Sequence, residues 1–366
     1  MGESYDLVVV GAGPAGASAA RAAAQRGVKV LLIDQRKRVG LPVQCGELVS
    51  QWISSYAPFD PRAIVQPVEA MAVHLPDQPP LWMKSPGYML DRHLFDNDLA
   101  ISAVLSGAEI AIGTKALHAS SEGVLLRRGT KEEWVRARVI IAADGLSSTV
   151  ARSANQPPLK ELRALQYEVV LHRPQSFTEI HFHPDYEGGY AWFFPKGKRA
   201  NAGVGVVPSK TSLLPELLDQ FLHGLKHSGN LPRVEIVSKT GGSIPCEPRK
   251  ETVVGNILFV GDAAGHAHPI TGAGILNAVM GGSMAGRIAA EAILSGNLGI
   301  LKNYEVEWNE AFGASLHYGF RKRRLLEENW NNKEIGFKNL IRKTWVGFRE
   351  YYEERRKRRH GHPNES

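Results

Sequence analysis

The sequence predicts an α/β protein in which a parallel sheet with helices is interleaved with an antiparallel sheet and followed by a helical C-terminal region. Three observations lead to this expectation. Apolar runs at 5–10 and 28–34 flank an Ala-rich, helix-favouring segment at 14–27, which is the pattern of a β-α-β unit. Residues 155–250 instead show short period-two alternation punctuated by Pro and Gly. After residue 300 the pattern is helical.

Length and composition fit a folded protein of two joined domains. A chain of 366 residues exceeds the roughly 250–300 residues at which single cores stop growing. Its 43% hydrophobic and 22% charged content is ordinary for a soluble protein. The two cysteines, Cys45 and Cys246, favour a reducing cytoplasm, although a pairing between them stays open. We expect neither a signal peptide nor a membrane-spanning helix.

The remaining elements continue this alternation along the chain. Residues 91–108 have the pattern of a helix, and short alternating segments at 109–138 predict antiparallel strands and hairpins. Buried-type strands are expected at 137–145 and 257–260, the latter followed by a Gly-rich turn and a helix. The predicted division is 1–70, 91–153 and 251–295 for the parallel-sheet domain, 71–90 and 154–250 for the antiparallel domain, and 296–366 for the helical region with a basic tail.

A glycine motif links the first strand to the first helix. "VVVGAGPAG" places Gly11, Gly13 and Gly16 in the spacing G-x-G-x-x-G. The first glycine permits a tight turn, the second lets the backbone approach a pyrophosphate, and the third lets helix and strand pack closely. Asp34 ends the second strand, where an acid binds ribose hydroxyls. Together these residues predict a Rossmann-like dinucleotide site at a helix N-terminus.

A second segment favours FAD over NAD as the dinucleotide. In "ILFVGDAAGHAHPITGAGILNAVMGG", residues 257–282, a strand leads into Gly261-Asp262 and then into a helix start. The aspartate is well placed for a ribityl hydroxyl. Gly272 and Gly274 let backbone N–H groups approach a flavin ring. A simple nicotinamide dehydrogenase needs no such second segment.

The combination of these segments resembles a known flavoprotein family. With Arg92 in "DRHLFDNDLA" and Asp144-Gly145 in "IIAADG", the chain is similar to the glutathione reductase-type family that includes para-hydroxybenzoate hydroxylase and geranylgeranyl reductases. From the residues alone, Arg92 also fits a surface charge and Asp144 a turn cap. No second G-x-G-x-x-G appears, so a separate NAD(P)H domain is not expected. The FAD contacts expected on this basis are Gly11, Gly13, Ala15, Gly16, Asp34, Gln35, Arg36, Cys45, Gly46, Arg92, Asp144, Gly145, Gly261, Asp262, Gly272, Gly274 and Ile275.

Two further motifs narrow the resemblance to geranylgeranyl reductases. "PVQCGE", residues 42–47, resembles the Pro-x-x-Cys-Gly segment of that family, and "GGYAWFFPKG", residues 188–197, resembles its substrate-domain signature. The resemblance implies reduction of isolated double bonds in a prenyl chain by hydride transfer from reduced flavin. It also implies a set of substrate contacts, namely Tyr190, Trp192, Phe194, Pro195 and Lys196.

The aromatic motif also has a direct physical interpretation. In a strand, Tyr190, Trp192 and Phe194 point to one face and would wall an apolar tunnel, while Phe193 points into the core. Ordinary sheet core is the alternative, because aromatic residues favour strands. Cys45, Tyr190 and Trp192 are the candidate catalytic residues. An ordinary thiol, with a pKa of ~8.5, is a weak acid for protonating an alkene, so positioning or redox gating is favoured for Cys45.

Several alternatives remain open at this point. An aromatic hydroxylase, an electron carrier to quinone and a lipid-binding flavoprotein without turnover share the same FAD segments. Two cysteines do not ligate an iron–sulfur cluster in the usual four-Cys manner. No metal site is expected, since His266 and His268 lack a nearby Cys or acid cluster. Geranylgeranyl diphosphate, a diether lipid, a chlorophyll precursor and a menaquinone all fit as substrate, and NADPH or a ferredoxin-like protein fits as electron donor.

The basic character of the chain is confined to its C-terminal tail. The net charge is +7, yet residues 321–360 hold 14 Lys or Arg against 6 Asp or Glu. The segment predicts an amphipathic helix that ends in "RRKRR" at 355–359. The candidate uses of this segment are peripheral contact with an anionic membrane on its cytoplasmic face, packing on the antiparallel domain, and docking of an acidic electron donor. Nucleic-acid binding is not expected. The apolar positions of this helix are Phe337, Leu340, Ile341, Trp345, Phe348 and Tyr352.

Overall fold

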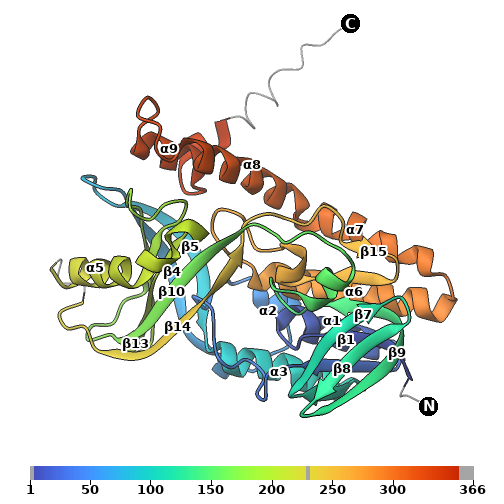
Figure 1. The fold of residues 1–366 in the computed structure, drawn as a ribbon. Coiled ribbons are helices and arrows are strands. Elements are labelled where there is room, and N and C mark those ends of the chain that lie inside the picture. Colours follow the sequence, from blue (N-terminus) through green and yellow to red (C-terminus); the bar gives the residue numbers. More distant parts are fainter. Residues whose placement is uncertain (1–3, 228–230, 354–366) are drawn as a thin grey trace, which may run out of the picture.

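A computed structural model describes residues 4–227 and 231–353 (Figure 1). Two eight-stranded sheets lie side by side, and the C-terminal helices run across the top of the molecule from the first sheet to the second (Figure 1). This arrangement confirms the predicted α/β class, with a second, mainly antiparallel sheet and a helical C-terminal region.

The first sheet has a parallel centre built from the most apolar strands. The strands β1 (Ser4–Val10) and β2 (Val30–Asp34) lie side by side in parallel register. Continuous Val, Leu and Ile runs suit strands that are covered on both faces. The order is β15 (Val253–Val254), β16 (Ile257–Phe259), β9 (Lys131–Ala142), β1, β2 and β6 (Glu109–Ile112), with β7 (Thr114–Ser120) and β8 (Gly123–Arg128) attached through β9.

Three helices cover one face of this sheet and pack on one another through small residues. They are α1 (Pro14–Ala24), α3 (Arg92–Leu105) and α6 (Ile275–Ser295). A Cβ atom at Gly282 or Gly286 of α6 would lie 2.1 Å from a backbone oxygen of α1. These two glycines therefore let α6 approach α1 at backbone distance.

The second sheet carries different residues on its two faces. Phe193 packs in the core beneath α5 (Leu214–His227), whereas Trp192 and Phe194 belong to the apolar cluster on the opposite face, as their alternation predicts. Among the strand pairs that the described residues form in this sheet, only β4 with β11 is parallel. The order is β14 (Ile236–Pro245), β10 (Glu161–Val170), β13 (Arg199–Val206), β12 (Ala191–Lys196), β11 (Phe177–His181), β4 (Ile64–His74), β5 (Leu81–Leu90) and β3 (Leu48–Ser50).

Local predictions differ from the structure at three places. Strand β6 pairs in parallel with β2, so the antiparallel pattern expected from residue 109 begins only at β7. Helix α1 ends at Ala24, before the predicted stop at Gly27. Strands β3 and β4 belong to the second sheet, although both begin within residues 1–70. Hydrogen-bond partners decide sheet membership, and a local pattern does not contain them.

The C-terminal region is helical but is not one long amphipathic helix. A run of α7 (Asn303–Trp308), a π-helical turn and α8 (Ala314–Asn329) precedes α9 (Phe337–Thr344), which ends eight residues before Tyr352. Of the predicted apolar positions, Leu340, Ile341, Trp345 and Phe348 are buried against the second sheet, which supports the packing alternative. The "RRKRR" segment lies outside the described residues. Within the described ranges, no helix is both long and apolar enough to span a bilayer.

Candidate functional site

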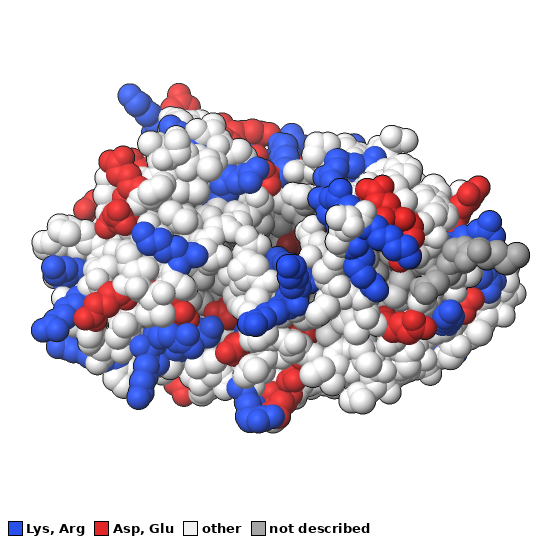
Figure 2. Space-filling model, turned by 60° about the horizontal axis from the view of Figure 1, so that its bottom comes forward, with Lys and Arg blue, Asp and Glu red and all other residues white. Residues whose placement is uncertain are grey.

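A deep cleft lies between the two sheets, and Figure 2 shows the molecule hollowed near its centre, with Lys and Arg side chains around the hollow. Its volume is about 810 Å³, which falls within the range of ligand pockets. The carboxyl ends of β1 and β2 open into this central cleft. In open α/β sheets, ligands bind at that edge of the parallel strands.

The three motif glycines have distinct surroundings. Gly11 has φ +105°, and a Cβ atom there would lie 2.3 Å from the backbone oxygen of Ala143. A Cβ at Gly16 would lie 1.8 Å from the oxygen of Gly11, so this position sets the contact between turn and helix. Gly13 lines the central cleft, and nothing lies within 4 Å of a Cβ built there. The free space at Gly13 suits the close approach of a phosphate.

The residues after β2 form the next part of the cleft wall. Asp34, Gln35 and Arg36 all line it. The Asp34 carboxylate accepts hydrogen bonds from the backbone N–H groups of Ala12 (2.9 Å) and Arg36 (2.7 Å). These bonds fix the carboxylate at the cleft edge, where it can accept from ribose hydroxyls.

The second glycine-rich segment lies on the opposite wall. Gly261, Asp262, Gly272, Gly274 and Ile275 line the central cleft, between the end of β16 and the start of α6. Asp262 is accessible from the cleft but lies deep among protein atoms, and this desolvation raises the pKa of its carboxyl group despite the opposing effect of Arg92.

Arg92 and Asp144 line the central cleft, but both already have partners in the protein. The Arg92 guanidinium makes two hydrogen bonds to the Asp96 carboxylate, at 2.8 and 2.9 Å. Asp144 accepts from the Ser148 hydroxyl at 2.5 Å and from the N–H of Thr149 at 2.7 Å, at the start of α4 (Thr149–Ser153). Asp144 therefore caps the turn after its strand, which is the alternative that its sequence position allows.

The residues that line the central cleft fit FAD. Of the predicted cofactor residues, Gly16 alone does not line the central cleft, and it acts by packing. Gly13 at the start of α1 would face the pyrophosphate, Asp34 the adenosine ribose, and Asp262 the ribityl chain. Gly272 and Gly274, which line the cleft, would leave backbone N–H groups accessible to the flavin ring.

The Cys45 loop, residues 40–47, connects the cofactor cleft to the second sheet. Cys45 and Trp192 both line the central cleft, although they come from motifs far apart in the chain. A Cβ atom at Gly46 would lie 3.1 Å from the Phe194 ring, so glycine allows the loop to lie on the aromatic motif. Four hydrogen bonds between a side chain and a backbone oxygen join loop and sheet: Gln44 to the oxygen of Gly241 (2.6 Å), Thr240 to that of Val43 (3.0 Å), Gln166 to that of Cys45 (3.1 Å) and Asn201 to that of Gly46 (3.2 Å).

A buried ion pair at the end of this loop was not predicted. Lys196 was expected to contact substrate, but it lies outside the cleft lining and donates to Glu47 at 2.6 Å. The side chains of Lys196 and Glu47 are only 6% and 3% exposed. Asn201 and the backbone N–H of Arg92 also donate to the Glu47 carboxylate, at 2.9 and 3.0 Å. The only signal in the sequence is that both charges lie inside the two family motifs.

The aromatic motif is only partly exposed to the cleft. Trp192 lines it and donates its indole N–H to Gln166 at 2.9 Å. Tyr190, Phe194 and Pro195 do not line the cleft. The Tyr190 hydroxyl donates to the oxygen of Thr271 at 2.5 Å, and burial raises its pKa. Tyr190 is thus held as a neutral phenol outside the cleft, so of the three candidate catalytic residues only Cys45 and Trp192 meet there.

Comparisons with known proteins identify the family. Residues 6–70 match the model of FAD dependent oxidoreductases, and residues 163–244 match that of the geranylgeranyl reductase catalytic domain. The chain is 38% identical to digeranylgeranylglycerophospholipid reductase 1 of Methanopyrus kandleri, over 88% of this chain and 91% of the relative. It is 35% identical to digeranylgeranylglycerophospholipid reductase 2 of Methanococcoides burtonii, over 87% of this chain and 83% of the relative.

Solved structures agree with this fold. A geranylgeranyl bacteriochlorophyll reductase-like protein from Thermoplasma acidophilum superposes with a TM-score of 0.83 at 27% identity, covering 96% of this chain and 98% of that one. A probable FAD-dependent monooxygenase from Pseudomonas aeruginosa has a TM-score of 0.69 at 16% identity, covering 93% and 100%, and shares the fold alone. The chain belongs to the family of geranylgeranyl and digeranylgeranylglycerophospholipid reductases, FAD-dependent oxidoreductases that saturate carbon–carbon double bonds of prenyl chains.

Proposed function

We propose that this chain reduces the geranylgeranyl chains of a digeranylgeranylglycerophospholipid. The meeting of Cys45 and Trp192 in the cleft that carries the FAD-type segments is the observation that carries the proposal. It joins the cofactor region to the part of the chain that matches the geranylgeranyl reductase catalytic domain. The names of relatives at 31–38% identity favour the glycerophospholipid over the other prenyl compounds.

The residues of the chain position the reacting groups and exclude water. Bound FAD, once reduced, supplies a hydride for one carbon of the double bond, whose other carbon takes a proton. Burial raises the pKa of the Cys45 thiol, although nearby Arg92 opposes this effect. The thiol therefore stays protonated at neutral pH and is a weaker acid than an exposed cysteine. Its role is to place the prenyl chain beside Trp192 rather than to protonate it.

An aromatic series continues from Trp192 away from the cleft. The ring centroids of Trp192 and Tyr190 lie 6.1 Å apart, those of Tyr190 and Trp345 5.2 Å, and those of Trp345 and Phe182 5.0 Å. All four side chains belong to or pack on one apolar cluster under the C-terminal helices. We propose that the prenyl chain lies in the central cleft beside Trp192, and that this packed series supports the Trp192 ring from behind.

The electron donor is proposed to be NADPH or an acidic ferredoxin-like protein. Arg36, Lys115 and Arg163 all line the central cleft and give it a positive margin that suits either donor. The test replaces dithionite by each donor in turn and records flavin reduction without oxygen. Fast reduction by NADPH alone would exclude the need for a protein donor.

Peripheral membrane contact remains a proposal that rests on charge. Because Leu340, Ile341, Trp345 and Phe348 pack inside the protein, contact would involve the basic residues beyond 353 and anionic lipid. A chain ending at residue 353 keeps the buried cluster intact and should sediment less with anionic vesicles than the full chain. Equal sedimentation would contradict the proposal.

The substrate assignment is tested with dithionite-reduced, FAD-loaded protein. The panel is digeranylgeranylglycerophospholipid, geranylgeranyl diphosphate, a prenylated chlorophyll precursor and a menaquinone, with products analysed by mass spectrometry. We expect the glycerophospholipid to gain two hydrogens per saturated bond at the highest rate, and FAD-free protein to leave it unchanged. Preference for another prenyl compound would refute the substrate. Oxygen-dependent NADPH consumption with an aromatic compound, without prenyl reduction, would refute the reductase assignment.

A further inference from the structure

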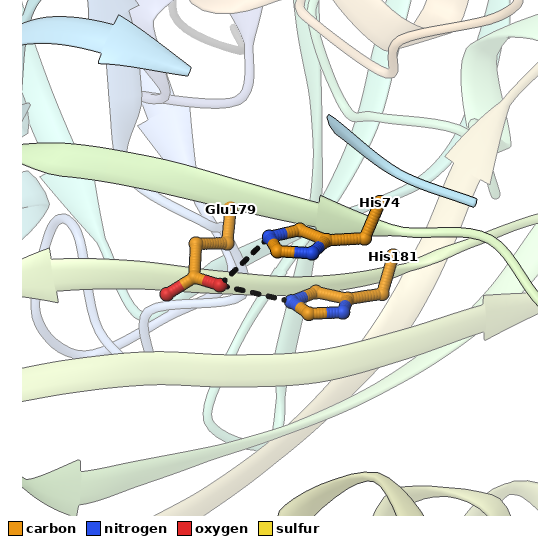
Figure 3. A group of neighbouring side chains, drawn as sticks. All are labelled: His74, Glu179 and His181. Carbon is orange, nitrogen blue, oxygen red and sulfur yellow. Dashed lines mark hydrogen bonds and ion pairs between the residues drawn. The ribbon is translucent and has the colours of Figure 1, made fainter. Parts of the chain in front are cut away.

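Two histidines and a glutamate come together on the second sheet, away from the central cleft. His74 ends β4, and Glu179 and His181 lie on β11. The parallel register places His181 beside His74, and Glu179 shares the face of His181 because it lies two residues earlier. Figure 3 shows both imidazole rings directed at the Glu179 carboxylate. The three ligand atoms lie within 4.8 Å of one another.

The carboxylate lies at the centre of this group. Its Oε2 is 3.0 Å from Nε2 of His74 and 3.2 Å from Nε2 of His181. The Glu179 side chain is 2% exposed, whereas those of His74 and His181 are 29% and 22% exposed. Gln175 donates to the other oxygen, Oε1, at 3.1 Å. One carboxylate oxygen and two imidazole nitrogens therefore converge, with solvent access from the histidine side.

The two imidazole nitrogens meet the same carboxylate oxygen. The Nε2 atom of His74 is buried, and its contact with Glu179 does not have hydrogen-bond geometry. The Nε2 atom of His181 lies within hydrogen-bond distance of Oε2. A metal requires deprotonated ligands, so binding would place the ring proton of each histidine on Nδ1 and leave Nε2 free for the ion.

We propose that His74, Glu179 and His181 bind one divalent transition-metal ion of the zinc class, with water as a fourth ligand. Two His and one Glu with an open position is a known ligand set for zinc. Gln175 then orients the carboxylate from outside the ligand shell.

The proposal also requires a small rearrangement. The rings of His74 and His181 are stacked, with centroids 4.1 Å apart and planes 2° from parallel. Their two Nε2 atoms therefore do not point at a common position. Turning the rings about their side-chain bonds, which their partial exposure permits, would bring the lone pairs together around the ion.

Such an ion would cross-link β4 and β11, which pair in parallel in the second sheet. Strands β4 and β11 come from distant parts of the chain, and Val73 and Ile180, which flank the ligands, point to the opposite face into the apolar cluster that holds Trp192. A metal cross-link between these two strands would stabilise the sheet that supports the proposed prenyl path. Its effect would be on stability, without a part in the redox chemistry.

The test uses FAD-loaded, tag-free full-length protein stripped of metal with a chelator. Co²⁺ is titrated while visible difference spectra are recorded, and Zn²⁺ is then added as competitor. We expect one Co²⁺ per chain with the absorption of four-coordinate Co²⁺, displacement by Zn²⁺, and a higher melting temperature with Zn²⁺. Absence of a saturable Co²⁺ band and of any Zn²⁺-dependent shift in melting temperature would overturn the proposal and leave a proton-sharing cluster.

Variants separate this site from adventitious binding. His181→Gln should abolish stoichiometric binding, and Gln175→Ala should weaken it by about 10–100-fold, as loss of an outer partner does. His172→Gln is the matched control, because His172 pairs with Glu235 at 2.6 Å on the surface and should leave binding unchanged. If His181→Gln fails to fold, Glu179→Gln tests the same ligand shell. Unchanged binding in a folded ligand variant would refute the site.

Discussion

Replacing Lys196 by methionine removes the ammonium group that lies 2.6 Å from the Glu47 carboxylate. Both side chains are buried, so the carboxylate would lose its cation without gaining water. Removal of one partner from a buried ion pair costs ~3–5 kcal/mol. Asn201 and the N–H of Arg92 still donate to Glu47, so we expect the lower end of this range, about 3 kcal/mol.

The assay is urea unfolding of FAD-loaded protein, followed by flavin release and circular dichroism. The matched control is Lys210→Met. The Lys210 ammonium lies 3.6 Å from the Glu187 carboxylate, and the two side chains are 42% and 32% exposed. A surface ion pair of this kind contributes ~0–1 kcal/mol to stability. Adding Glu47→Gln to Lys196→Met should recover part of the loss, because no buried charge then lacks a partner. A Lys196→Met cost equal to that of Lys210→Met would refute the account of this pair.

Three further predictions concern the cofactor, acid stability and the prenyl path. Gly13→Ala should leave unfolding of the FAD-free protein unchanged, because no atom lies within 4 Å of the new Cβ. It should lower FAD affinity by about 100-fold through lost backbone bonds of ~1.5–3 kcal/mol each. Gly224→Ala is the control for the FAD titration, and equal titrations would contradict the cleft assignment. Burial lowers the pKa of His266 from 6.5 to about 3. The unfolded chain therefore takes up the proton first, and the stability of the fold decreases as pH drops below 6.5, by about 2 kcal/mol at pH 5. His266→Leu should remove this loss in unfolding measured at pH 7 and 5, and an unchanged pH dependence would count against the prediction. Gln166→Leu leaves the Trp192 N–H without its acceptor, so prenyl reduction should slow at unchanged FAD content, whereas wild-type rates would show that this bridge does not position the ring.

The cofactor half of the site was predictable because its signals are local. The spacing of Gly11, Gly13 and Gly16, followed by an acid at the end of the next strand, predicts a turn, a helix start and a ribose contact within one β-α-β unit. The structure places Gly11, Gly13 and Asp34 at one cleft with Asp262, which comes from a segment with the same kind of local signal.

Long-range contacts were less predictable. Glu47 and Lys196 are 149 positions apart, and nothing in either local pattern shows that they pair. The group of His74, Glu179 and His181 depends on the parallel register of two strands that the sequence does not specify.

The C-terminal segment shows why an amphipathic pattern does not identify its partner. The spacing of Leu340, Ile341 and Trp345 predicts an apolar face, but a protein core and a lipid surface demand the same face. Only the packing against the second sheet distinguishes the two.

The central claim is that the FAD-type cleft reduces prenyl double bonds, and anaerobic flavin reoxidation tests it most directly. Reduced, FAD-loaded protein is mixed with digeranylgeranylglycerophospholipid, and the return of oxidised-flavin absorbance is compared with the mass gain of the lipid. The account predicts one flavin reoxidised for each double bond saturated. Reoxidation without saturated product, or none until oxygen is admitted, would contradict it.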